Sequence, residues 1–424
     1  MPTYTVPMDE AKRLINHTID TNLQLEEKGD YPVAISLEAT AGIGKTSIIK
    51  QIAEERGMTF VKLNMAQLEE PGDLIGFPIV EYECQTARKV KDETGAVKLK
   101  VNPGTVWLSA KQIDNMDKSL VRTTGRNRTG YAKPAWVPEY NEKGTLILLD
   151  DYVRANPQLL QACMDLILEQ KYISWSAPKR TTFVLTNNPD DGTNNVNSLD
   201  EAQRTRFMNY EVEWTADAWA KWAEKAGIDG RCINFVLCYS GELFGADAQG
   251  NRICNPRSFT MFTKMISGIK DWENPDNLAF IRTISRGCFK DEHDRFGSMF
   301  TSFIRNKMHL LIQPKDMLTG SWDRVKHILS ETLFDEDGTW RSDLASLLER
   351  RFTNYVGVWL ESGDKTPIST VKDRILEFMR FKNIDGKPLF NKDMFYHMIK
   401  TITSDHRNQT NKLLLEPEIA KYRA

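Results

Sequence analysis

The segment Ala39-Thr40-Ala41-Gly42-Ile43-Gly44-Lys45-Thr46 has residue types and a spacing suited to binding phosphate. It matches the phosphate-loop pattern GxxxxGK(S/T) at every fixed position except the first, where alanine stands instead of glycine. In this pattern, backbone N–H groups point at phosphate oxygens, the lysine reaches the β- and γ-phosphates, and the hydroxyl binds Mg²⁺. The sequence therefore predicts a nucleotide site formed by Ala41, Gly42, Ile43, Gly44, Lys45, Thr46 and Ser47.

Two carboxylates, Asp150 and Asp151, directly follow the apolar run Leu146–Leu149, which is suited to a strand buried on both faces. Carboxylates that end such a strand beside a phosphate loop can serve phosphoryl transfer. We expect Asp150, together with Thr46, to hold Mg²⁺ and Asp151 to activate a water molecule.

Strands and helices alternate around these residues, as in the βαβ units of a parallel sheet. Helices are expected over residues 8–27, 45–55 and from Pro157 onward, where Asn156 is the expected N-cap. We predict a five-stranded parallel sheet, with strands at residues 33–37, 59–63, 145–149, 182–186 and 207–214.

A long insertion interrupts this pattern over about residues 78–143. Residues 81–101 alternate charged and apolar side chains around Asp92-Glu93-Thr94-Gly95, which predicts a β-hairpin. Residues 123–130 have the composition of a mobile basic loop. Across residues 85–133, eleven Lys or Arg stand against four Asp or Glu. Trp107 lies within this basic segment and Trp136 just after it, and the two could stack bases or anchor the insertion onto the core.

Composition excludes several classes of protein. Lys and Arg total 56 against 58 Asp and Glu, which excludes a wholly basic nucleic-acid binder but allows a local patch. No apolar stretch approaches the roughly 18–20 residues of a membrane span, and the first residues do not form a secretory signal. The six scattered cysteines are expected to be free thiols, so we expect a cytoplasmic protein that does not bind a membrane.

Four stretches of the chain resemble the MoxR branch of the AAA+ ATPases, the group with an insertion in the second helix. The phosphate loop is followed by residues 70–76, EPGDLIG, similar to the family's "SDLTG" segment. Residues 150–157, DDYVRANP, resemble "DEINRAPP", and Thr186-Asn187-Asn188-Pro189 with Glu201-Ala202-Gln203 and Arg206-Phe207 resembles "TQNP…EAQLDRF". Residues 255–258, NPRS, resemble "SPRAS". The resemblance covers residues 8–290.

The resemblance implies roles for three more residues. Asn188, with Asn187 as the alternative, would orient the attacking water. Arg206, with Arg204 as a weaker alternative, would be an arginine finger that reaches the ATP of a neighbouring subunit. Arg257 would contact the nucleotide from a helical lid domain.

The chain departs from the family pattern at several positions. Asp151 replaces the usual Glu, Ala39 the first Gly, and Val153 the usual Asn. The insertion is longer and more basic than the family's, the hairpin at residues 172–180 is short, and residues 291–424 match none of the family's motifs.

The resemblance implies an AAA+ P-loop core at residues 1–214 and a helical lid at 215–290. Helical periodicity predicts a mostly helical C-terminal region at 291–424, which we expect to be an adaptor or assembly domain. It also implies Mg²⁺-dependent ATP hydrolysis by a hexameric ring that remodels a protein client, with a von Willebrand-type adaptor as partner. Two alternatives remain. The basic insertion could mark a nucleic-acid motor or loader, and Asp151 could mark a slowly hydrolysing ATP switch.

Overall fold

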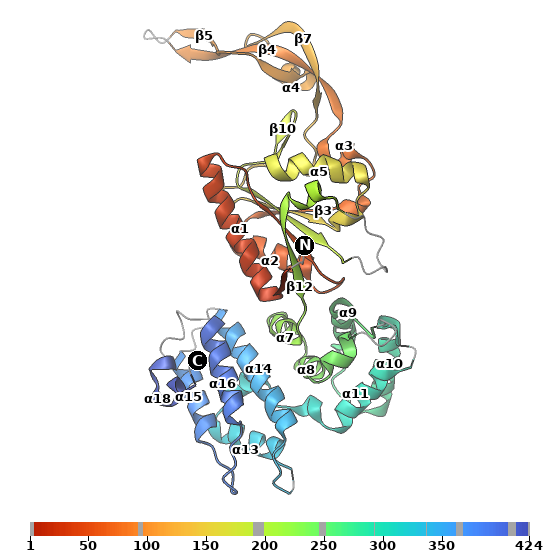
Figure 1. Cartoon of the computed structure of the whole chain (residues 1–424), viewed down its shortest axis with the longest axis vertical. Helices are drawn as coiled ribbons and strands as arrows, with labels where there is room; N and C mark the ends of the chain where they lie inside the picture. Colours follow the sequence, from red (N-terminus) through yellow and green to blue (C-terminus); the bar gives the residue numbers. More distant parts are fainter. Residues whose placement is uncertain are drawn as a thin grey trace. The chain divides into compact units, whose positions relative to one another are not determined.

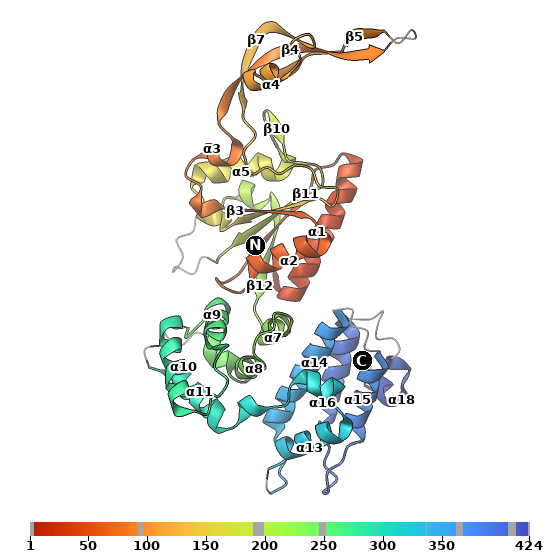
Figure 2. The same cartoon turned by 180° about the vertical axis from the view of Figure 1, so that it is seen from behind.

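The computed structural model describes residues 4–91, 96–189, 199–245, 252–291, 293–335, 337–361, 368–405 and 413–422. The chain forms two compact units, Met1–Glu213 and Trp214–Ala424 (Figures 1 and 2). The first unit contains the sheet and the insertion, and the second is helical.

A six-stranded sheet forms the centre of the first unit, and all its neighbouring strands are parallel. In spatial order its strands are β1 (Tyr4–Pro7), β12 (Phe207–Glu213), β2 (Ala34–Glu38), β11 (Thr181–Asn187), β8 (Thr145–Asp150) and β3 (Thr59–Asn64). The predicted α/β class is confirmed, but the predicted count of five strands was wrong. The additional strand is β1, a four-residue edge strand in which only Val6 is buried, so the sequence contains no alternation that would reveal it.

Helices cover both faces of this sheet. The helices α1 (Met8–Lys28) and α2 (Lys45–Arg56) contact each other and strands of the sheet. On the other face, α5 (Pro157–Glu169) packs Leu159, Cys163 and Leu166 against inward residues of β8 and β11. The side chain of Asn156 accepts a hydrogen bond from the Leu159 amide, as expected of an N-cap. The shorter elements are α3 (Pro71–Ile75), α6 (Glu201–Arg204), η1 (Met65–Gln67), η2 (Tyr152–Arg154) and the hairpin β9 (Lys171–Tyr172) with β10 (Trp175–Ser176).

The insertion is an antiparallel β-structure built on the long strand β4 (Pro78–Lys91). β4 pairs with β5 (Val97–Val101), β6 (Val106–Ser109) and β7 (Val121–Tyr131), and α4 (Ala110–Asn115) precedes β7. The predicted hairpin is present as β4 and β5, although residues 92–95 at its turn lie outside the described residues. The expectation of a loop at residues 123–130 was wrong. These residues belong to β7, whose pairing with β4 supplies backbone partners that local composition does not show.

The second unit is built around one hydrophobic core that runs from Ala216 to Ile419. Both the predicted lid and the predicted C-terminal region contribute to this core, and the boundary between them near residue 290 stays a prediction. The helices are α7 (Ala216–Lys225), α8 (Gly230–Phe244), α9 (Pro256–Ile266), α10 (Pro275–Cys288), α11 (Arg295–Arg305), α12 (Pro314–Thr319), α13 (Trp322–Leu333), α14 (Ser342–Glu361), α15 (Ile368–Arg380), α16 (Lys392–Asp405) and α18 (Pro417–Ala420), with the short turns η3 (Met308–Leu310) and η4 (Leu413–Leu415).

A buried charge joins the two parts of this core. The guanidinium of Arg351 on α14, with 1% of its side chain exposed, donates to Glu224 on α7 over 2.6 Å and to Asn234 on α8 over 2.7 Å. Because a buried guanidinium is costly without partners, these bonds fix how α14 packs against α7 and α8.

Among the described residues, no helix is long and apolar enough to cross a membrane.

Candidate functional site

The phosphate loop joins β2 to α2 at the carboxyl end of the sheet, where ligands of parallel sheets commonly bind. Gly42 and Gly44 have φ angles of 86° and 102°, a region that residues with a Cβ rarely adopt. Ala39 is buried, is not among the residues of positive φ, and donates its amide hydrogen to the Asn187 carbonyl over 3.1 Å. Alanine therefore replaces the first glycine of the pattern without backbone strain.

Lys45 lies over this loop and is 8% exposed. Its Nζ donates to the carbonyl oxygens of Ala39 over 2.5 Å and Thr40 over 3.3 Å, and to Oδ1 of Asn188 over 3.0 Å. These three oxygen acceptors thus hold the Lys45 ammonium beside the loop. The oxygens of a bound phosphate could accept the same hydrogen bonds in their place.

Thr46 and Asp150, the two predicted metal ligands, are in contact. Oγ1 of Thr46 donates to the Asp150 carboxylate at 3.2 and 3.4 Å, and Thr186 Oγ1 donates to the same group over 2.5 Å. Burial acts to raise the pKa of Asp150, but the ion pair with Lys62 and the hydroxyl donors outweigh burial and lower that pKa. The carboxylate is therefore ionised at neutral pH. A hydroxyl beside an ionised carboxylate is an oxygen donor set that fits Mg²⁺, which uses few protein ligands.

Asn188 connects the loop lysine to the second carboxylate. Its Oδ1 accepts from Lys45, while its Nδ2 donates to Oδ1 of Asp151 over 2.9 Å. Asp151 has a φ of 54°, a left-handed conformation that Asp tolerates better than most residues. Residues with such rarely populated backbone angles are often found in active sites.

The structure separates the two candidate asparagines. Asn187 is directed into the protein, where its Nδ2 donates to Ser36 Oγ over 2.9 Å and its Oδ1 accepts from the Val153 amide over 3.1 Å. Asn188 alone of the two contacts Lys45 and Asp151. The geometry therefore favours Asn188 for orienting water, and this role stays a prediction.

Arg206 lies away from the phosphate loop of its own chain. Phe207, the next residue, pairs with Ala34 at the start of β2, whereas the loop follows Glu38 at the end of β2. At about 3.3 Å per residue, these two ends of β2 are roughly 13 Å apart. Within the described part of the chain, the Arg206 side chain forms no hydrogen bond or ion pair. Arg206 is partly exposed, while Arg204 donates from Nε to the Leu199 carbonyl, and a role of Arg206 toward a neighbouring subunit stays a prediction.

Arg257 lies in the second unit, at the second position of α9, and is exposed. Asn255 caps this helix by accepting from the Ser258 amide. The contact of Arg257 with nucleotide stays a prediction.

Sequence reasoning missed three polar residues around Asp150. Lys62 Nζ lies 2.6 Å from Asp150 Oδ2, Thr186 donates to Oδ1, and Asn64 pairs in register with Asp150 across β3 and β8. Oδ1 of Asn64 is buried and has no hydrogen-bond partner among the described residues. Lys62 and Asn64 both lie on β3, and their i, i+2 spacing, which places them on one face, was the available signal.

The two tryptophans of the insertion, Trp107 and Trp136, already have partners within the first unit. Trp136 donates from Nε1 to the Leu74 carbonyl over 2.8 Å and meets Trp175 edge to face. The guanidinium of Arg128 lies over the Trp107 ring at 4.6 Å. The contacts of Trp136 support the anchoring interpretation for that residue, whereas the contact of Trp107 lies within the insertion, between β6 and β7.

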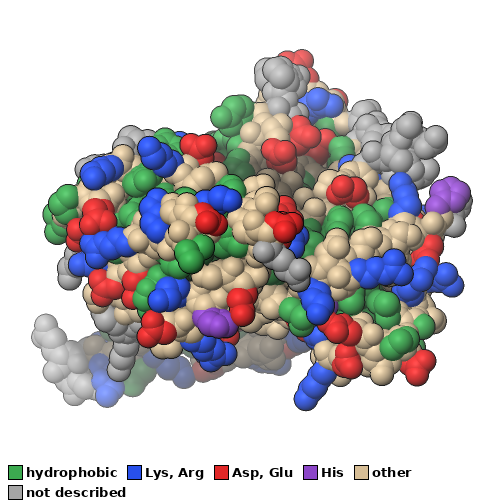
Figure 3. Space-filling view, turned by 90° about the horizontal axis from the view of Figure 1, so that it is seen from below, with side chains coloured by type: hydrophobic (Ala, Val, Ile, Leu, Met, Phe, Trp, Pro, Cys, Tyr) green, Lys and Arg blue, Asp and Glu red, His purple; other side chains and the backbone are tan. Residues whose placement is uncertain are grey.

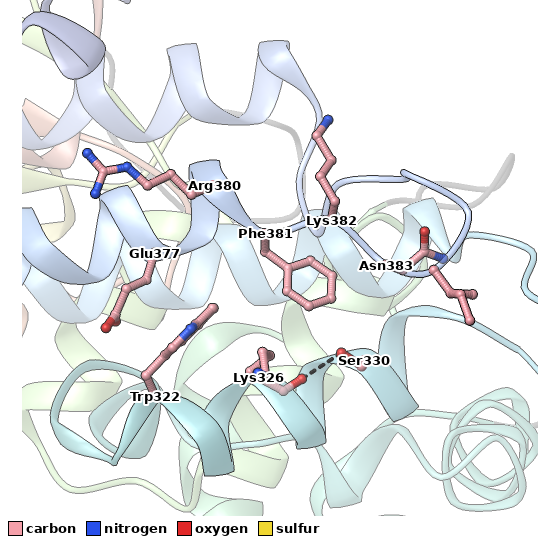
Figure 4. A pocket seen from close by; sticks show the side chains of 9 residues that line it. Trp322, Lys326, Ser330, Glu377, Arg380, Phe381, Lys382 and Asn383 are labelled. Carbon is pink, nitrogen blue, oxygen red and sulfur yellow. Dashed lines mark hydrogen bonds between the residues drawn. The ribbon is translucent and has the colours of Figure 1, made fainter.

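A groove of about 620 Å³ lies in the second unit between α13 and α15 (Figure 4). Trp322 and Phe381 line it, and two of its charged groups, Glu377 and Arg380, have partners nearby. Glu377 pairs with Arg374 at 3.3 Å and Arg380 with Glu418 at 2.7 Å. Figure 3 shows positive and negative side chains intermixed on one face of the molecule, without a patch of one sign. Neither feature indicates a ligand.

No protein-family model and no curated protein sequence matches the chain. Among solved structures, it is similar to a candidate ATPase from Cytophaga hutchinsonii, with 14% identity and a TM-score of 0.29 over 65% of this chain and 79% of the other. It is also similar to a point mutant of RuvB from Thermotoga maritima, with 12% identity and a TM-score of 0.27 over 91% of this chain and 95% of the other. Similarities this low support no conclusion about function. The functional proposal therefore rests on the geometry of the site.

Proposed function

We propose that this chain is a MoxR-like AAA+ ATPase that hydrolyses ATP with Mg²⁺ in a ring and uses the energy to remodel or assemble a protein complex. The observation that carries the proposal is the position of Asn188, which joins Lys45 to Asp151 next to the Thr46–Asp150 contact. A phosphate-binding lysine, a hydroxyl–carboxylate pair and a second carboxylate with its own amide partner are the groups that ATP hydrolysis needs.

Each residue has a part in this reaction. Lys45 and the amides of the loop bind the β- and γ-phosphates, and Asp151 accepts a proton from water that Asn188 orients. Thr46 and Asp150 would hold Mg²⁺, which neutralises phosphate charge when bound. Arg206 stabilises the charge of the transition state from the neighbouring subunit, so the site is complete only in an assembly. Arg257 senses the nucleotide from the lid.

The partners belong to the same proposal. A hexamer, a protein client and a von Willebrand-type adaptor are proposed from the motif resemblance, with the insertion as the segment that contacts the client. Mass measurement of the assembly with and without ATP tests the ring, and a chain that stays monomeric with ATP contradicts it. For the client, proteins captured by an ATP-loaded Asp151→Asn variant are compared with those captured by Lys45→Ala.

One observation favours nucleic acid as an alternative client. Among the described residues, four basic side chains of the insertion are paired with acids: Arg128 with Glu81, Lys89 with Asp117, Arg126 with Glu83 and Lys133 with Glu139. Others, including Arg88, Lys91 and Lys100, are exposed and have no ion-pair partner among the described residues. These exposed cations could contact phosphates of single-stranded nucleic acid.

The shorter side chain of Asp151 motivates a second alternative, an ATP-bound scaffold with slow turnover. Tight ATP binding with hydrolysis too slow to exceed that of Lys45→Ala would favour it.

A further inference from the structure

Lys62 contacts the carboxylate that is predicted to hold the metal ion. Its Nζ lies 2.6 Å from Oδ2 of Asp150, and its side chain is 41% exposed, whereas that of Asp150 is 15% exposed. Lys62 therefore reaches from the surface to a largely buried group.

The strand register explains this approach. β3 pairs in parallel with β8, so that Asn64 lies opposite Asp150 and Lys62 lies two residues earlier on the same face of β3. The Lys62 side chain extends along this face toward the carboxyl end of the sheet, where the phosphate loop also lies.

Asp150 has two kinds of partner. Two neutral hydroxyls, Thr46 and Thr186, donate to it, and Lys62 provides a full positive charge. The hydroxyl of Thr46 and the carboxylate of Asp150 are the proposed metal ligands, so the ammonium lies beside the position that a metal ion would take between them.

We propose that Lys62 is a tethered counter-ion that neutralises Asp150 in the nucleotide-free chain and must leave it when Mg²⁺ and nucleotide bind. The inference rests on the proposed function, because it concerns the same metal site. An ammonium and a divalent cation repel each other when they share one carboxylate. Lys62 can move away because a lysine has a flexible four-carbon stem and more than a third of this side chain is exposed. Lys62 is thus a positioning residue that sets how much Mg²⁺ the site requires.

The competing explanation is a purely structural ion pair that ties β3 to β8. In that case removing the ammonium would lower thermal stability without increasing the affinity for Mg²⁺. The two explanations therefore predict different responses to a metal titration.

The test uses the full chain and measures binding of a fluorescent ADP analogue while MgCl₂ is titrated, so that hydrolysis does not enter the readout. Lys62→Met keeps the stem and removes the charge, and Lys62→Arg keeps the charge. We expect Lys62→Met to lower the half-saturating Mg²⁺ concentration by about tenfold, and Lys62→Arg to stay close to wild type. Lys50→Met is the matched control, because Lys50 is exposed on α2 and its one ion pair among the described residues is with Glu54 at 3.6 Å.

An unchanged or higher Mg²⁺ requirement in Lys62→Met overturns the inference while leaving the nucleotide site intact. If the wild-type chain binds no ADP analogue at any Mg²⁺ concentration, the proposed function fails and the inference fails with it. Lys62→Gln is measured in parallel, and thermal denaturation of each variant shows whether it is folded. Should Lys62→Met not fold, Lys62→Gln decides by the same criterion.

Discussion

The side-chain amide of Asn188 donates from Nδ2 to Oδ1 of Asp151 over 2.9 Å and accepts from Lys45 at its other end. One amide thus joins the residue proposed to bind the phosphates to the residue proposed to activate water. A phosphate bound by Lys45 and a water molecule polarised by Asp151 would therefore lie on either side of the same side chain.

Replacing Asp151 by Asn should remove the proton acceptor but leave the phosphate loop unchanged. We expect the turnover number to fall by about a hundredfold or more, while the affinity for ATP changes little. Single-turnover hydrolysis and equilibrium binding of a fluorescent ATP analogue measure the two quantities separately. Equal turnover by Asp151→Asn and wild type would show that Asp151 is not the base.

An arginine finger that acts between subunits predicts rescue in mixed assemblies. Lys45→Ala and Arg206→Ala should each be inactive alone. Mixing them creates interfaces that combine an intact Lys45 from one subunit with an intact Arg206 from its neighbour, so the mixture should hydrolyse ATP. Arg204→Ala is the control, because Arg204 donates to the Leu199 carbonyl of its own chain. Failure of the mixture to exceed its separate components would argue against Arg206 acting between subunits.

Adjacent arginines on α14 should differ greatly in their contribution to stability. Arg351 is buried and bonded to Glu224 and Asn234, so Arg351→Met leaves the largely buried Glu224 carboxylate without this partner and should cost about 3–5 kcal/mol of unfolding free energy. Arg350 pairs with Asp217 at 2.8 Å, with 30% and 48% of the two side chains exposed, and Arg350→Met should cost about 0–1 kcal/mol. Chemical denaturation measures both. Similar losses for the two variants would show that the buried pair has no special role.

The nucleic-acid alternative predicts that single-stranded DNA binds through the exposed cations of the insertion. Affinity should fall steeply with salt, and changing Arg88, Lys91 and Lys100 together to Gln should make the slope of log affinity against log salt shallower by about 2. Fluorescence anisotropy at several salt concentrations provides this slope. If the wild-type chain shows no DNA binding and no DNA-stimulated ATP hydrolysis, the alternative is excluded.

Local sequence patterns predicted the phosphate loop and the central strands because each is determined by neighbouring residues. The positive φ angles at positions 42 and 44 favour glycine there. The strand that ends at Asp150 is apolar because both its faces are buried. The contact between Lys62 and Asp150 could not be predicted in the same way. It depends on the pairing of β3 with β8, two strands separated by the whole insertion.

The errors have the same origin. The edge strand β1 contains one buried residue, and β7 is a Thr- and Arg-rich segment whose pairing with β4 determines its conformation. Neither has a pattern that is visible in its own residues. The proposed MoxR-like assignment and the proposed roles of Arg206 and Arg257 rest on motif resemblance alone.

Mg²⁺-dependent ATP hydrolysis by the purified full chain, measured for wild type, Lys45→Ala and Lys50→Ala, tests the central claim most directly. Lys45 is buried against the phosphate loop, whereas Lys50 is exposed five residues later on the same helix. We predict steady turnover by wild type and Lys50→Ala, and none by Lys45→Ala. Hydrolysis by Lys45→Ala at the wild-type rate, or no hydrolysis by the wild-type chain, would contradict the assignment of this site as an ATPase centre.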